Sequence, residues 1–207
     1  MQPKTNAELQ TLVRTEIQQH GDQCDLNHID VSLITNFSGT FKDLAFNGDI
    51  SRWDVSGATE MAGMFFSSKF NGDISKWNVS SAVEMGGMFY KSKFNGDISK
   101  WDVSSAESMY QMFFRSKFCG EISEWDVSQV VSMNLMFFCS KFNGDISKWD
   151  RFSRIKDKYM FKGSATALKL GTKNPSFEQV KSYFIGLELE AGLKEAPEQR
   201  KTPKVRL

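Results

Sequence analysis

Tryptophan recurs every 24 residues through the middle of the chain, and this fixed interval constrains the fold more than any other feature. The five tryptophans are Trp53, Trp77, Trp101, Trp125 and Trp149. Phenylalanine, glycine and isoleucine keep the same interval, starting at Phe46, Gly48 and Ile50. Because the five copies follow one another without insertion or deletion, we expect each copy to contact its neighbours in a stack.

Each 24-residue unit changes its apolar period part-way along. One stretch places its apolar residues at helical spacing, namely Ala106, Met109, Met112 and Phe113. This spacing predicts a short helical segment. The stretch 97–103 is rich in Gly, Ser and Asp, which predicts a turn and a brief extended piece that pairs in parallel with the next copy. The fold class that we predict is an α/β repeat solenoid of short parallel strands and short helical segments.

Both ends of the chain carry helix signals. Thr5 and Glu8 form a Thr-x-x-Glu capping box, and Gly21 follows the apolar-periodic stretch that they open. Ser176 opens a second such stretch. We therefore expect four parts: an N-terminal capping helix at 1–21, a solenoid of five full repeats with degenerate end units at 22–165, a C-terminal capping helix at 166–190, and a basic mobile tail at 191–207.

Composition excludes several classes of protein. The 26 basic and 25 acidic residues leave a net charge of +1, which gives no general attraction to nucleic acid or anionic membranes. No apolar run reaches the roughly 18 residues of a membrane span. The three cysteines, Cys24, Cys119 and Cys139, are odd in number and form no CxxC pair, so we expect reduced thiols and neither disulfides nor a zinc site. If the chain is complete, its lack of a signal peptide predicts a cytoplasmic location.

Residues with catalytic chemistry are few. The only histidines are His20 and His28, and a lone histidine needs partners to act as a base or a ligand. The sequence contains no phosphate-binding glycine loop, no HExxH and no nucleophile elbow. We therefore predict that the protein is not an enzyme and uses no cofactor.

One acidic column raises the question of calcium. Its members are Asp49, Asp73, Asp97, Glu121 and Asp145. It lacks the dense acidic loops of EF-hands and of calcium-binding β-rolls. We expect instead a carboxylate ladder that caps turns and is neutralised by the lysines four residues earlier, with no metal.

A basic column raises the question of nucleic acid. Its members are Arg52, Lys76, Lys100 and Lys148, interrupted by Glu124. Such a stripe can follow phosphates, but the neighbouring acidic column cancels much of its field. We expect a solvated charged edge and no nucleic-acid partner.

Partner recognition is best placed where the repeats vary. In four units a second aromatic residue directly follows the phenylalanine that recurs every 24 residues, at Phe66, Tyr90, Phe114 and Phe138. Lys91 and Arg115 flank these rings, and Tyr110, Gln111 and Leu135 occupy variable positions nearby. The rings form either an exposed apolar strip that binds a partner or the filling of a corner between strand and helix. These nine residues are our candidate partner-binding site.

Short sequence motifs of the repeat resemble those of a known family. The unit FNGDISKWDVS, the MxxMF box and the opening CDLNHIDVS together resemble the BspA-like leucine-rich-repeat surface proteins, also known from mycoplasma lipoprotein-associated repeats. The resemblance implies a bacterial, right-handed, leucine-rich-repeat-like solenoid that acts in adhesion or protein recognition at the cell surface or outside the cell. Residues 166–207 fall outside it.

These observations predict a non-enzymatic protein–protein interaction module with adhesin-like recognition by the solenoid surface. The alternative is a small intracellular inhibitor, encoded by a mobile element, that binds and blocks a host or rival enzyme. A nucleic-acid binder is the third and weakest hypothesis.

Overall fold

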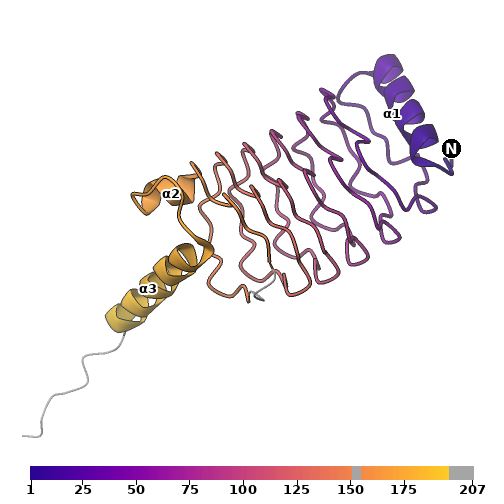
Figure 1. The fold of residues 1–207 in the computed structure, drawn as a ribbon. Coiled ribbons are helices and arrows are strands. Elements are labelled where there is room, and N and C mark those ends of the chain that lie inside the picture. The colour runs from indigo at the N-terminus through magenta and orange to yellow at the C-terminus, as the bar shows by residue number, and fades with distance from the viewer. Residues whose placement is uncertain (151–154, 196–207) are drawn as a thin grey trace, which may run out of the picture.

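The computed structural model describes residues 1–150 and 155–195. Helix α1 (Asn6–His20) lies at one end, helices α2 (Ala165–Lys169) and α3 (Phe177–Glu195) lie at the other, and a row of stacked coils runs between them (Figure 1). Neighbouring coils are joined by bridges between residues 24 apart, such as Glu60 with Glu84 and Glu84 with Ser108. Each coil is therefore one sequence unit.

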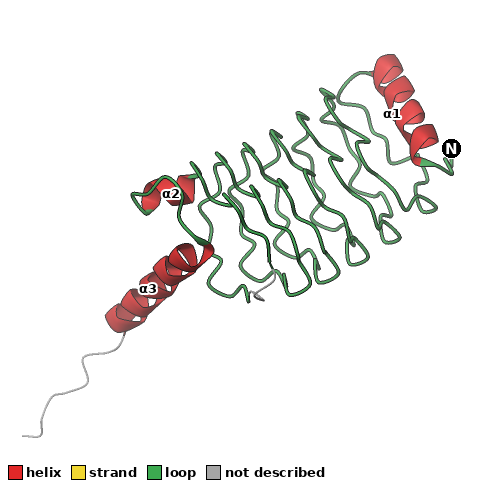
Figure 2. Ribbon diagram, in the orientation of Figure 1, coloured by secondary structure: helices red, strands yellow, loops and turns green. Residues whose placement is uncertain are grey.

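The predicted α/β architecture is wrong. Between α1 and α2 the described residues form turns, bends and loops, without a helix or a sheet (Figure 2). Neighbouring coils meet through isolated parallel bridges. The chain thus does not form the predicted leucine-rich-repeat-like solenoid of short parallel strands and short helical segments.

The hydrogen bonds of the predicted helical segment explain this difference. Its backbone N–H groups alternate between two kinds of acceptor. Those of Met109, Gln111, Phe113 and Arg115 donate to carbonyls of the next coil, whereas those of Met112, Phe114 and Ser116 donate three residues back. An α-helix needs consecutive bonds four residues back, so this alternation produces a chain of tight turns despite the helical spacing of the apolar side chains.

Positive φ angles in the same segment rule out regular structure as well. Gln111 has φ 55° and Arg115 has φ 51°, in the left-handed region that neither right-handed helices nor strands use. The equivalent positions 63 and 87, and 67 and 91, are also left-handed. Each of these coils therefore has left-handed residues at the same two positions, where the backbone turns.

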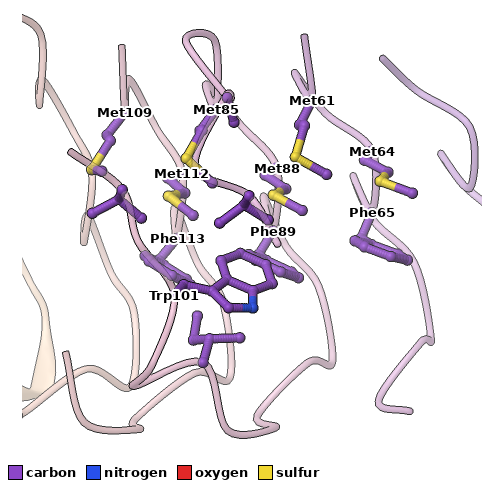
Figure 3. Packing of buried hydrophobic residues seen from close by; sticks show 14 of the residues in the cluster. Met61, Met64, Phe65, Met85, Met88, Phe89, Trp101, Met109, Met112 and Phe113 are labelled. Carbon is purple, nitrogen blue, oxygen red and sulfur yellow. The ribbon is translucent and has the colours of Figure 1, made fainter. Parts of the chain in front are cut away.

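The core runs without a break along the inside of the coils. Met and Phe columns such as Met61, Met85 and Met109 are fully buried, and each side chain packs on its copy in the next coil (Figure 3). Phe65 and Phe89 stack with ring centroids 5.6 Å apart and planes 4° apart. Burial of a large apolar side chain contributes about 1.5–3 kcal/mol, so repetition of one buried pattern gives the stack its stability.

The tryptophan column satisfies its own polar group. The indole N–H of Trp101, which is 3% exposed, donates to the carbonyl of Ile74 at 3.0 Å. Trp77 makes the same bond to Ile50 at 3.2 Å. A buried N–H donor needs a hydrogen-bond acceptor. These two tryptophans find one in the preceding coil, so each fills the core and also bonds its coil to the one before it.

Asparagine and serine columns complete the stacking. The side-chain oxygen of Asn71 accepts the N–H of Asn95 at 2.6 Å, and that of Asn95 accepts the N–H of Cys119 at 2.7 Å. The asparagine side chains therefore bond neighbouring coils to each other. The buried hydroxyl of Ser92 accepts the N–H of Phe94 at 3.1 Å, a role that the sequence interpretation missed.

Helix α1 covers the first coil. Thr5 is its N-cap, with the hydroxyl accepting the N–H of Glu8 at 3.2 Å, and Leu9 and Val13 are fully buried against the coils. Asn6 and Gln10 side chains both donate to the carbonyl of Ser38 at 2.9 Å. The helix therefore shields the apolar end of the stack from water.

Two helices, rather than the predicted single cap at 166–190, follow the last coil. The α2 residue Thr166 donates its hydroxyl to the carbonyl of Phe142 at 3.0 Å. In α3, Phe177 and Val180 are buried, and the Lys181 ammonium donates to the carbonyl of Trp149 at 2.7 Å. The predicted tail at 191–207 overlaps α3, and residues 196–207 lie outside the described part of the chain.

Candidate interaction surface

The second aromatics of the repeat form one continuous stack, which we call the aromatic ladder: Phe66, Tyr90, Phe114 and Phe138. Their ring centroids are 4.3, 4.6 and 4.9 Å apart in order, and successive planes differ by 3°, 2° and 4°. Such close stacking arises because each ring occupies the same place in its coil. The predicted juxtaposition of the four rings is therefore present.

The ladder is half-buried, whereas the preceding phenylalanines are fully buried. Phe65, for example, is 0% exposed, and Phe66 beside it reaches solvent. The faces of the ladder rings pack against neighbouring rings, so mainly the ring edges are accessible to a partner. The position combines features of both interpretations, a packed corner and an exposed apolar strip.

Cations surround the ladder, and we call them the cationic rim: Lys42, Lys91, Arg115 and Lys162. Lys91 lies 5.4 Å from the Tyr90 ring centroid, and the Arg115 guanidinium lies 5.6 Å from that of Phe114. Cation–π contacts of this kind contribute about 0.5–1 kcal/mol at exposed sites. Lys42 and Lys162 were missed from the sequence because they belong to the degenerate end units.

The remaining predicted residues lie beside the ladder. Gln111 and Leu135 take the left-handed position that Gly63 and Gly87 fill in earlier coils, with φ 55° and 59°. A Cβ added to Gly63 would be 3.7 Å from the Cβ of Phe66, which shows how close this column runs to the rings. Next to Gln111, Tyr110 is 43% exposed. Side chains thus replace glycine only in the C-terminal half of the column.

Basic residues also dominate the segment that follows each ladder ring. The exposed column Lys69, Lys93, Lys117 and Lys141 lies three residues after the rings. The overall charge of +1 therefore conceals an uneven distribution, with a basic and aromatic corner along one side of the coils.

The acidic column caps turns, as its non-metal interpretation proposed. Asp49, Asp73 and Asp97 accept the backbone N–H of the serine two residues later, at 2.8–2.9 Å. Hydrogen bonds from Ser75 hold the pKa of Asp73 below its usual value, with a smaller contribution from Lys76. The predicted neutralisation by a lysine four residues earlier is not among the ion pairs of the described residues. Within the described ranges, no three His, Cys, Asp or Glu side chains are grouped to hold a metal ion.

The basic stripe is partly neutralised by ion pairs. Lys148 contacts Glu124 at 2.5 Å, and Arg52 lies 3.7 Å from Asp25. The hydrogen bond and charge of Lys148 lower the pKa of Glu124, and Glu124 raises that of Lys148. Two of the four cations of the stripe, Arg52 and Lys148, therefore have a carboxylate partner.

The two histidines share one acidic neighbour. His20 and His28 both face Glu16, with nitrogen–oxygen distances of 3.8 and 3.4 Å. All three cysteines are free thiols. In the helices that the structure describes, no segment is long and apolar enough to cross a membrane.

The repeat identifies a family. The model of the family DUF285, described as Mycoplasma protein of unknown function, matches residues 14–117 and again residues 95–186. The chain belongs to this family. The match confirms the mycoplasma repeat part of the resemblance, while the BspA-like part stays a prediction. No curated protein and no solved structure matches the chain significantly.

Proposed function

We propose that this DUF285 protein is a non-enzymatic protein-binding module, with adhesin-like recognition of the kind that the BspA-like resemblance implies. The observation that carries the proposal is the aromatic ladder with its cationic rim. Aromatic residues and arginine are the side chains enriched where proteins bind one another tightly. An array of coils presents them as one long, regular edge.

The charge of the corner indicates the chemistry of the partner. Lys91 and Arg115 lie against ladder rings, and an exposed lysine follows each ring three residues later in the sequence. An acidic protein surface would complement this charge. Single-stranded nucleic acid also combines negative charge with planar rings. The ladder rings already stack on one another, however, and so offer few free faces on which bases can stack. This argues for protein over nucleic acid.

A charge-reversal comparison tests this function. The protein is immobilised as wild type, as Lys91→Glu with Arg115→Glu, and as a matched control, Lys76→Glu with Lys100→Glu, on the basic stripe. Circular dichroism and thermal melting verify that all three are folded. We expect proteins retained from a lysate by the wild type and the control to be lost from the ladder variant.

Two outcomes contradict the proposal. Equal retention by all three proteins would show that the ladder corner does not bind, and tight binding of a single-stranded oligonucleotide at physiological salt would indicate a nucleic-acid binder. If the retained partner is an enzyme and loses activity in the complex, the inhibitor form of the function replaces the adhesin-like form.

A further inference from the structure

An apolar cavity of about 450 Å³ lies at the C-terminal end of the aromatic ladder. Its lining includes Phe138 and Cys139 of the last coils, Lys162 of the following turn, Leu168 of α2, and Lys173 beyond α2. Its size falls within the range of about 300–1,000 Å³ that is typical of ligand sites. No candidate residue drawn from the sequence other than Phe138 lines it.

The cavity begins where the ladder ends. The position 24 residues after Phe138 is Lys162, so no further ring continues the stack. One face of Phe138 packs on Phe114 at 4.9 Å. From the next turn, the Lys162 ammonium lies 6.0 Å from the Phe138 ring centroid. Lys162 therefore fills the next position of the ladder, and an aromatic ring entering the cavity would lie against both Phe138 and Lys162.

The mouth of the cavity is positively charged. Among the described residues that line it, the ionisable ones are Lys162, Lys173 and the thiol of Cys139, and none is a carboxylate. A ligand with an aromatic ring and neighbouring carboxylates therefore matches the cavity in both shape and charge.

Exposed apolar groups extend from the cavity wall to the surface around it. Leu168 is 78% exposed and Tyr159 is 42% exposed. The Lys162 ammonium is 4.9 Å from the Tyr159 ring and contacts Phe138 as well, which places Tyr159 at the same mouth. A small aromatic acid would fill the cavity and leave these groups in water, whereas a polypeptide would cover them.

We propose that this cavity binds an aromatic side chain of the partner protein, from a segment in which carboxylates flank the ring. The proposal rests on the protein-binding function above and gives it a specific anchor. A buried aromatic side chain in a pocket is the usual centre of binding energy in such interfaces.

Calorimetry with short peptides tests the anchor directly. The probe is a capped five-residue peptide with a central tryptophan between glutamates. The matched peptides replace the tryptophan with leucine or the glutamates with lysines. We expect saturable binding of the first peptide and affinities at least about tenfold weaker for the other two, since each loses a stacking or charge interaction. No binding of the first peptide, or equal binding of all three, would overturn the proposal.

Variants locate the binding on the protein. Leu168→Asp puts a carboxylate at the mouth of the cavity, and Leu189→Asp makes the same change at a 65% exposed position on α3. Both side chains are exposed, so both variants should fold. We expect Leu168→Asp to weaken peptide binding about tenfold or more and Leu189→Asp to leave it unchanged; equal effects would place the peptide elsewhere.

The thiol of Cys139 reports occupancy of the cavity. In a Cys24→Ser, Cys119→Ser background, we expect the tryptophan peptide to slow alkylation of Cys139, and an unchanged alkylation rate would contradict the proposal. Indole-3-acetate that binds as tightly as the peptide would identify a small-molecule site instead. The charge-reversal capture experiment tests the proposed function independently of the cavity. If the peptide binds but the Lys91→Glu, Arg115→Glu variant still captures partners, the proposed function is wrong and the cavity proposal stands. If the variant loses capture but the peptide does not bind, only the cavity proposal is wrong.

Discussion

At the scale of single residues, close packing decides which positions of the unit are fixed. A Cβ added to Gly72 would lie 2.8 Å from the ring of Phe70 and 3.2 Å from the carbonyl oxygen of Gly48. The column is therefore glycine because of the close approach of neighbouring atoms. Its φ angles are not positive, so left-handed conformation plays no part in this column.

A pair of alanine substitutions tests this reason. We expect Gly72→Ala to lower the free energy of unfolding by about 1–3 kcal/mol, as overpacking does. Gly57→Ala is the control, because no atom lies within 4 Å of its added Cβ, and it should be neutral or stabilising by about 0.4–1 kcal/mol. Urea denaturation measures both. A Gly72→Ala protein as stable as the wild type would show that the ring of Phe70 moves aside without cost.

At the scale of the structural element, the turn segment beside the ladder combines strain with exposure. Gly39, Gly63 and Gly87 occupy its first left-handed position in the early coils, and Gln111, Leu135 and Tyr159 occupy it later, with φ of 55°, 59° and 57°. Left-handed conformation costs a residue with a Cβ about 1–2 kcal/mol. At this first position the strained residues lie beside the half of the ladder that leads to the cavity, whereas the second left-handed position carries a Cβ from the early coils onward, as at Ser67 and Lys91.

Two substitutions of Gln111 separate strain from binding. We expect Gln111→Gly to raise the free energy of unfolding by about 1 kcal/mol, because glycine has no left-handed penalty. Gln111→Ala retains the penalty and should be no more stable than the wild type. Both remove the side chain, so both should weaken partner capture equally. Identical urea midpoints for the two variants would contradict the strain argument.

At the scale of the whole molecule, the repeated Asp–Ser turns couple stability to pH. The pKa values of Asp49, Asp73 and Asp97 are all lowered from 3.8, through hydrogen bonds from the following serines. A lowered folded-state pKa means that the unfolded chain takes up protons first. The stabilisation is therefore complete above the unfolded pKa and is lost as pH falls through the folded values.

Replacement of the carboxylates by amides tests this coupling. Asn78 shows that an amide keeps the turn, because its side-chain oxygen accepts the N–H of Ser80 at 3.1 Å. In the Asp73→Asn, Asp97→Asn protein we expect a shallower loss of stability between about pH 5 and pH 2.5 than in the wild type. Chemical denaturation over this pH range measures the slope. Parallel curves for the two proteins would rule out a contribution from these carboxylates.

The sequence by itself determined the register of the molecule. Identical residues at identical intervals predict that each Trp, Phe and Asn meets its own copy one coil away, and the Asn71–Asn95 bond and the ladder have this geometry. The capping box of Thr5 and Glu8 likewise located α1, since a helix start depends on neighbours in sequence.

Only the tertiary structure decided the backbone conformation within each coil and the arrangement at the end of the stack. The helical spacing of Met109, Met112 and Phe113 arises in a chain of turns, because alternate N–H groups bond to the next coil, and local periodicity does not reveal a partner so distant in sequence. The cavity, too, joins Phe138 to Leu168 and Lys173, which no repeat relates. A repeated sequence pattern predicts contacts between its copies. The cavity forms where the repeats stop, so its shape depends on how the non-repeated C-terminal segment folds.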